Sequence, residues 1–339
     1  MKSRFLILIS LFFSLSILSQ VGGETVYNFL NISTSARQTA LGGKVLTLLD
    51  DVNQPIWNPS VINSNLDKQL AVNYSSYLAG VNIGSISYSK LINRRFGNLQ
   101  ASIKYLNYGS FIGADENGVE SGSFNASDIA FSVGYSKNIP LTNFYIGGNI
   151  KLIHSSISNY SSSGFAIDLA LLYNNPFKDF VFTFVARNIG MQLSSFNGER
   201  EKLPFELVLG GSYKLEHVPL KWYVTMDNLQ KWNIAVANPS NQIIDLEGNV
   251  TKESIGFLDK MFRHFIIGAE LFPERSINLR VGYNFRRATE LKLQNVRTFG
   301  GISFGFGLKM NKIKLNYAYS KVHTASNIST FSLQIDLNK

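Results

Sequence analysis

The chain has 339 residues, of which 45% are apolar and only 16% are charged, below the roughly 25% charge of ordinary soluble domains. Tyr (15), Phe (25) and Gly (27) are abundant and Pro (8) is scarce, which favours many long strands over a helical enzyme. The absence of Cys excludes disulfides, thiolate catalysis and Cys-based zinc sites. The net charge of +9 is scattered without any basic run, so we expect no nucleic-acid binding.

The first segment, residues 1–23, reads as a secretory signal peptide that is cleaved. Two basic residues, Lys2 and Arg4, precede an apolar stretch over residues 5–18, and small residues follow it. A retained anchor helix is the alternative, but no stop-transfer flank is present. No later segment has the apolar length of a transmembrane helix, so we expect an exported chain that crosses a membrane only with strands.

Residues 24–68 lack the period-2 pattern of strands, and we interpret them as a compact N-terminal hatch segment. Ser35 is expected to N-cap a short helix that ends at the following pair of glycines. An Asn-Pro pair further on marks a turn or the start of a second helix. The acidic pair Asp50-Asp51 lacks the spacing of a calcium loop, which favours a solvated loop. The hatch motif residues are Ser35, Ala36, Arg37, Gly42, Gly43, Asn58, Pro59 and Ser60.

Residues 69–339 alternate between apolar and small or polar side chains, most clearly over residues 127–190. Because successive side chains of a strand point to opposite faces, each run has one apolar face. We predict an all-β, transmembrane antiparallel β-barrel of about fourteen strands, whose even count puts both chain ends on the same side. The predicted strands are 69–77, 82–91, 97–108, 127–138, 143–156, 163–174, 179–189, 204–215, 219–228, 262–272, 276–287, 298–310, 312–320 and 327–337.

The charged residues that we noted within these strands lie on the parity opposite to the apolar run. This is expected where one face meets hydrocarbon, because Lys or Arg at the lipid midplane costs about 2–4 kcal/mol. A soluble sandwich shows the same alternation with its apolar face inward, but Gly, Ala and Ser on the polar faces favour a crowded lumen. We expect a paired network that fills the lumen, with an anion-selective channel as the alternative. Its members are Lys104, Lys151, Asp168, Arg187, Glu206, Asp227, Arg280 and Asp336.

The connections between strands differ in length from one side of the barrel to the other. Tight turns alternate with longer loops at 109–126, 190–203, 229–261 and 288–297, as in barrels with short periplasmic turns and long extracellular loops. The loop of residues 230–260 is the longest and combines Trp232 with Pro239, so it is our candidate for docking a partner. The alternative is a mobile loop without function.

No catalytic constellation is visible in the sequence. The histidines are widely spaced and form no known hydrolase or metalloprotease motif. Gly305 and Gly307 lie in a strand with no helix after it, so they do not form a phosphate loop. We therefore expect no enzyme activity, no cofactor and no metal site. The four histidines are His154, His217, His264 and His323.

The motifs of the hatch segment carry a family resemblance. They are Tyr27-Asn-Phe-Leu-Asn31, Ser35-Ala-Arg37, Ala40-Leu-Gly-Gly43, Asp50-Asp51 and Asn58-Pro59-Ser60. Ahead of a strand-rich body, they resemble the PorQ family of the Bacteroidota type IX secretion system. The related PorV proteins share these elements less closely and tend to be longer. Both are similar to FadL-like outer-membrane barrels, whose hatch bears Asn-Pro-Ala, from which Ser60 departs.

The resemblance implies a non-enzymatic subunit of the cell-surface attachment complex, set in outer-membrane lipid. That complex releases secreted cargo and anchors it to surface lipopolysaccharide. PorQ-like proteins are thought to hold a surface protein of PorZ type, alongside PorU and PorV type proteins. The alternative is a FadL-like channel for a hydrophobic small molecule. It requires an apolar path through the hatch and a lateral opening, for which the Gly-rich strand 298–310 is the candidate.

Overall fold

The computed structural model describes residues 25–77, 80–93, 96–175, 177–236, 243–244, 250–251, 255–292, 299–323 and 326–338. The predicted signal peptide, residues 1–23, lies outside the described residues. Within these ranges, no helix is long and apolar enough to cross a membrane.

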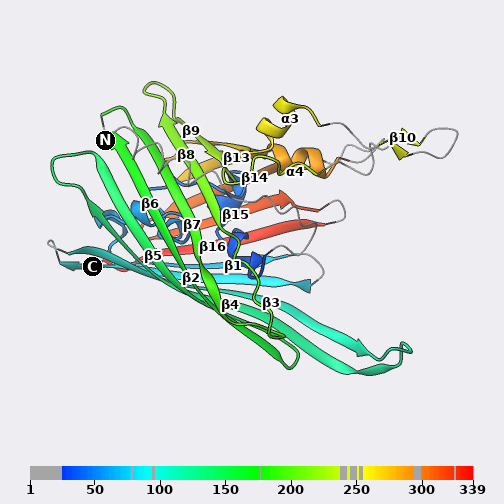
Figure 1. The fold of residues 1–339 in the computed structure, drawn as a ribbon. Helices are drawn as coiled ribbons and strands as arrows, with labels where there is room; N and C mark the ends of the chain where they lie inside the picture. The colour runs from blue at the N-terminus through cyan, green and yellow to red at the C-terminus, as the bar shows by residue number, and fades with distance from the viewer. Residues whose placement is uncertain are drawn as a thin grey trace, which may run out of the picture.

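The main element is a closed antiparallel barrel of fourteen strands (Figure 1). Each strand pairs with the barrel strands before and after it, and β1 pairs with β16 to close the ring. A separate two-stranded ribbon, β10 (Ile243–Ile244) and β11 (Val250–Thr251), lies between β9 and β12 in the chain. The barrel strands are β1 (Gln69–Ser76), β2 (Asn82–Asn93), β3 (Gly97–Ala114), β4 (Glu120–Asn138), β5 (Phe144–Ile157), β6 (Tyr160–Asn175), β7 (Phe180–Ser194), β8 (Glu206–Lys214), β9 (Leu220–Met226), β12 (Phe265–Leu271), β13 (Ile277–Asn284), β14 (Ile302–Met310), β15 (Ile313–Lys321) and β16 (Asn327–Asp336).

The barrel confirms the predicted fold class and strand count, but two segments were assigned wrongly. Residues 285–287 were predicted as strand and instead begin a helix, α4 (Phe285–Glu290), whose first turn is capped by Asn284 Oδ1 accepting from the Arg287 amide at 2.9 Å. Most of the predicted loop 109–126 is strand, because β3 and β4 continue as a long hairpin. Gly109 has a φ of +85° at a bulge, which flips the side-chain parity and hid this continuation.

One half of the barrel wall is about twice as tall as the other. Strands β3 and β4 have 18 and 19 residues, whereas β9 and β12 have 7 each. A tilted strand needs only about 9–11 residues to cross a bilayer. We therefore expect the tall wall of β3–β7 to project beyond the membrane at the long-loop end, where the β3–β4 hairpin extends past the neighbouring strands in Figure 1.

The outer surface of the barrel is largely apolar, and charged side chains such as Lys151, Arg187 and Arg280 are buried inside it, as predicted. Along β13, for example, Leu279 and Val281 are about half exposed, whereas Asn278 and Arg280 are buried. Exposed apolar side chains recur in this way on every barrel strand. A closed barrel satisfies its backbone groups internally, so such a surface is suited to lipid.

The hatch lies inside the barrel and runs along its length. Thr25 forms a bridge with Lys202 at the long-loop end, while the Leu337 amide donates to the Lys68 carbonyl (3.0 Å) at the short-turn end. The barrel therefore begins at β1 and ends at β16 on the short-turn side, as the even strand count predicts, whereas the described part of the hatch starts at the opposite, long-loop end. The hatch elements are η1 (Asn28–Asn31), α2 (Ala36–Ala40), η2 (Gln54–Ile56), η3 (Pro59–Val61) and η4 (Ser64–Leu66).

Candidate functional site

The first hatch motif forms the short helix α2. Ser35 is its N-cap residue but makes no capping hydrogen bond. Instead, Ser332 Oγ on the barrel wall accepts from the Ala36 amide at 2.8 Å. The helix ends where Gly42 and Gly43 take φ values of +101° and +98°, which favour glycine. A side chain at Gly42 would also overlap Ile266 on the wall, so this end of the helix is fixed by the barrel.

The second motif forms a tight buried turn. Asn58 Oδ1 accepts from the Ser60 amide (3.0 Å) and caps η3, which places Pro59 in the first turn. The Asn58 Nδ2 amide donates to the Leu46 carbonyl at 2.7 Å and to Thr183 Oγ1 on β7 at 3.1 Å. One Asn side chain thus holds the turn, the rest of the hatch and the wall together.

Glycines on the lumen face give the hatch room to approach the wall. A side chain at Gly147 would overlap the backbone of Pro59 and Ser60. A Cβ at Gly210 would lie 2.8 Å from Leu46 Cβ, and one at Gly305 would lie 2.8 Å from Ala40 Cβ. The small residues predicted to suit a crowded lumen therefore lie where the hatch backbone packs against the strands.

Arg37 makes the first ionic anchor between hatch and wall. Its guanidinium donates to Asp50 (2.8 Å) in the hatch and to Glu270 (2.8 Å) on β12. Arg280 on β13 pairs with the same Glu270 at 2.7 Å, and Tyr223 donates to it at 2.9 Å. Burial lowers the pKa of Arg37, but the two carboxylates outweigh that effect and raise it above its ordinary value, so the anchor stays charged.

Lys44 makes the second anchor. Its ammonium contacts Glu206 on β8 and lies 2.9 Å from Asp227, which follows β9. Arg187 on β7 pairs with Glu206 from the other side at 2.9 Å and donates to the Leu30 carbonyl at 3.3 Å. All four charged side chains are almost fully buried. Such pairs cost about 3–5 kcal/mol to break when one partner is removed.

The remaining lumen cations also face inward. Lys151 pairs with Asp168 at 2.6 Å within the wall. Lys104 contacts no carboxylate among the described residues, and its ammonium donates to the carbonyls of Leu30 (3.2 Å) and Ile32 in the hatch. The wall therefore holds the hatch through backbone carbonyls as well as through ion pairs.

The predicted lumen network is thus confirmed in outline, with corrections at its edges. Asp336 does not join it and instead accepts from the Asn338 amide at 2.9 Å near the short-turn end. The sequence reading missed Arg37 and Lys44 as ionic partners, because it treated the hatch separately from the strands. It also missed Glu270, although this residue lies within a predicted strand and on its polar face.

The residues proposed for docking have a mixed outcome. Trp232 packs against His264 and Phe257, with ring centroids 5.3 and 5.4 Å apart, so it forms the base of the loop. Pro239 lies outside the described residues.

His264 is buried and its ring contacts the carbonyls of Asp227 and Trp232. In the part of the chain that the structure describes, no His, Asp and Glu side chains gather into a metal-binding group.

Two cavities with charged side chains in their lining flank the hatch at opposite ends of the lumen. The cavity at the long-loop end measures about 300 Å³ and is lined by Lys44, Arg286 and Arg287 among others. The cavity at the short-turn end measures about 240 Å³ and is lined by Arg37, Asp50, the turn after β12 and several residues of β13–β16. Hatch residues line both spaces, Thr39 and Lys44 the first and Arg37 and Asp50 the second.

A closed fourteen-stranded barrel with an apolar outer face and an internal N-terminal hatch defines an outer-membrane β-barrel of the FadL type. Solved structures agree on the fold. The toluene transporter TbuX from Ralstonia pickettii has a TM-score of 0.55 and 12% identity, covering 92% of this chain and 100% of that chain. The deltaS2 mutant of the monoaromatic hydrocarbon channel TodX has a TM-score of 0.51 and 14% identity, covering 91% and 98%. A FadL homologue from Pseudomonas aeruginosa has a TM-score of 0.50 and 11% identity, covering 90% and 99%.

The family model described as type IX secretion system protein PorV matches residues 20–221, more than half of the sequence. The chain belongs to this family. We had expected the hatch motifs to resemble PorQ more closely than PorV, and the model that matches is that of PorV. No curated protein matches the chain significantly.

Proposed function

We propose that this protein is a non-enzymatic subunit of the type IX secretion attachment complex that holds a partner at the cell surface. The observation that carries the proposal is that the hatch fills the lumen. Hatch residues are packed into the barrel from Thr25 to Leu66, and Arg37 and Lys44 are locked by buried carboxylates. A barrel that is filled in this way is suited to presenting its outer loops rather than to conducting.

Within the PorV family, we propose a role of PorQ type on the strength of the hatch motifs in residues 27–60. The partner would then be a surface protein of PorZ type, with PorU and PorV type proteins in the same complex. Outer-membrane lipid surrounds the barrel through its apolar face.

The long-loop end offers two features that suit a protein partner. The tall wall of β3–β7 projects beyond the bilayer, and its β3–β4 tip exposes Ile112 (70%) and Val119 (63%). The loop-base patch, which we define as Trp232, Phe257, Leu258 and Phe262, is about half or more exposed on and beside α3 (Phe257–Phe262). Exposed aromatic side chains of this kind often anchor a protein interface.

The experiment compares cell-surface retention of the partner in variants of these two features. Phe257→Ser with Leu258→Ser removes two of the exposed apolar side chains of α3, and deletion of residues 237–254 shortens the chain between β9 and α3. We expect either change to release the partner into the medium while the barrel remains in the membrane. A matched control is Phe177→Ser, which removes a 92% exposed Phe in the short turn between β6 and β7. Full retention in both variants would contradict the proposal.

The second candidate is a channel for a hydrophobic small molecule. It is favoured by an apolar groove of about 610 Å³ on the outside of the barrel, lined by Phe306, Leu315 and Phe331 among others. The lateral opening that this candidate requires is not found at β14, which pairs with β13 from Ile302 to Leu308 and with β15 from Ser303 to Met310. Uptake of a labelled hydrocarbon by cells with and without the protein distinguishes the two, and equal uptake rejects the channel.

A further inference from the structure

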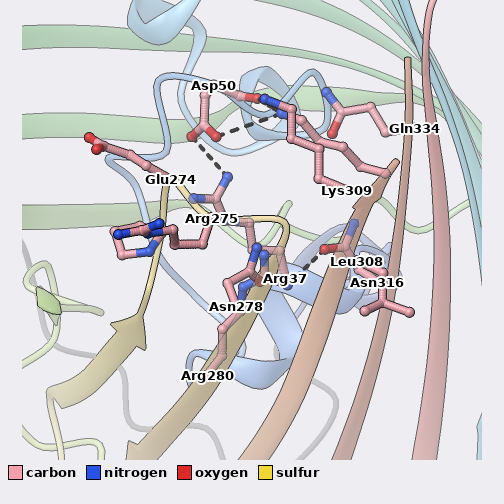
Figure 2. A pocket seen from close by; sticks show the side chains of 12 residues that line it. Arg37, Asp50, Glu274, Arg275, Asn278, Arg280, Leu308, Lys309, Asn316 and Gln334 are labelled. Carbon is pink, nitrogen blue, oxygen red and sulfur yellow. Dashed lines mark hydrogen bonds and ion pairs between the residues drawn. The ribbon is translucent and has the colours of Figure 1, made fainter. Parts of the chain in front are cut away.

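The cavity at the short-turn end has a chemistry that neither candidate function uses. It lies between the hatch, the turn after β12 and the ends of strands β13–β16 (Figure 2). The short turns assign this side of the barrel to the periplasm. Arg37 and Asn278 are buried at its base, while Arg275 and Lys309 are exposed at its mouth. The cavity is therefore open to solutes on one side and closed by the hatch on the other.

Cations outnumber carboxylates around this cavity. Arg37, Arg275, Arg280, Lys309 and Lys314 line it, against Asp50 and Glu274. Glu270 behind the cavity pairs with both Arg37 and Arg280, so five cations face three carboxylates. Glu274 is itself paired with Lys214 outside the cavity.

Two of the five cations are available for a ligand. Lys314 lies 3.8 Å from Asp50, and Arg37 and Arg280 are bound by carboxylates. Among the described residues, the side chains of Arg275 and Lys309 form no ion pair. Two free cations at the mouth of a partly enclosed, cationic space attract an anion more strongly than the same charges on an open surface.

Asn278 indicates that the ligand also carries a hydrogen-bond donor. Only 8% of the residue is exposed, and its Oδ1 has no hydrogen-bond partner in the described structure. A buried acceptor of this kind is satisfied by a donor such as a hydroxyl group. Gly307 keeps the space beside it open, since a Cβ there would lie 2.5 Å from Asn278 Oδ1 and 2.9 Å from Arg280 Nη2.

We propose that this cavity binds a small anion that also carries hydroxyl groups, with glycerophosphate as the representative chemistry. Arginine and lysine side chains match the charge and geometry of a phosphate group, and Asn278 accepts from a neighbouring hydroxyl. The volume of about 240 Å³, equal to about eight water molecules, is large enough to hold a glycerophosphate group. The inference does not rest on the proposed function, because it concerns the opposite end of the barrel.

The same chemistry has two sources, a free periplasmic solute and the headgroup of a lipid. Titration calorimetry of the full-length protein in detergent with sn-glycerol 3-phosphate tests the first source. Thermal unfolding in nanodiscs of phosphatidylglycerol, compared with phosphatidylcholine, tests the second. Heat of binding in the titration, or a higher unfolding temperature in phosphatidylglycerol alone, is the expected result.

Two variants show whether the cavity is responsible. Arg275→Ala with Lys309→Ala removes exposed and unpaired charges and leaves the fold intact, and we expect binding at least tenfold weaker. Asn278→Asp places a carboxylate at the base and is expected to abolish binding. Lys137→Ala is the control, because it removes an exposed charge from the short-turn end of β4, on the far side of the ring from β14. No response to either probe, or responses that the cavity variants leave unchanged, would overturn the proposal.

Discussion

The guanidinium carbon of Arg187 on β7 lies 4.0 Å from the centroid of the Trp57 ring in the hatch. This contact joins the wall to the hatch at a point where both side chains are buried. Arg187 also donates to Glu206 on β8, so one residue combines an ion pair with a cation–π contact. These two contacts explain why the charged side chain of Arg187 is stable inside the barrel.

Arg187→Lys tests how much of this stability depends on the guanidinium. Lysine keeps the charge but loses the planar group that stacks on Trp57 and the paired donors to Asn31 and Leu30. We expect a loss of about 2 kcal/mol or more in the free energy of unfolding, since a desolvated cation–π contact alone contributes about that amount. Trp57→Ala is expected to cost about 3–5 kcal/mol. Urea unfolding in lipid vesicles measures both.

Glu270→Gln tests the first ionic anchor. The change leaves Arg37 and Arg280 without their shared carboxylate in a buried site, and we expect a loss of about 3–5 kcal/mol in the free energy of unfolding. The control is Glu274→Gln, which makes the same chemical change at an ion pair with Lys214 where the glutamate side chain is 76% exposed. That pair should contribute no more than about 1 kcal/mol, and equal losses at both sites would refute the anchoring role.

Gly147→Val tests the close approach of the Asn-Pro-Ser turn to the wall. Because a Cβ at this position overlaps Pro59 and Ser60, we expect the hatch to be displaced and the thermal unfolding temperature to fall. Gly148→Val is the matched control, since its Cβ would meet the Asp168 carbonyl at an ordinary 3.6 Å. Differential scanning fluorimetry in detergent compares them, and an equal fall in both would argue against the contact.

Asn58→Ala and Ser60→Ala separate the roles of two neighbouring motif residues. Asn58 bonds to the turn, to Leu46 and to Thr183, so its removal leaves several buried groups unpaired at a cost of about 1–3 kcal/mol. The Ser60 hydroxyl contacts Asn58 alone among the described side chains, and alanine should cost less than about 1 kcal/mol. The order of the two unfolding free energies checks this, and a larger loss at Ser60 would reverse the assignment.

Much of the barrel follows from the sequence, because lipid and lumen impose opposite side-chain preferences on alternate residues of a strand. The alternation fails where the backbone departs from a regular strand, as at the Gly109 bulge in β3. It also fails where Asn284 caps a helix immediately after β13. At both positions the backbone changes direction, and the alternation of side chains alone does not show this change.

The anchoring network was less accessible to sequence reasoning. Arg37 and Glu270 are 233 positions apart, and Lys44 and Asp227 are 183 apart. Nothing local to either partner shows that they meet, because the pairing depends on the path of the hatch through the lumen. The hatch motifs themselves were visible as short turns and caps, whereas their partners on the wall were glycines and single carboxylates.

The central claim is that the hatch closes the lumen through buried ion pairs and close backbone contacts. Single-channel recording in planar bilayers, with the purified protein and then with the Glu270→Gln variant, tests it most directly. The account predicts a wild-type baseline without open-channel steps, and intermittent steps in the variant as the anchor at Arg37 weakens. A steady conductance through the wild-type protein would contradict the account.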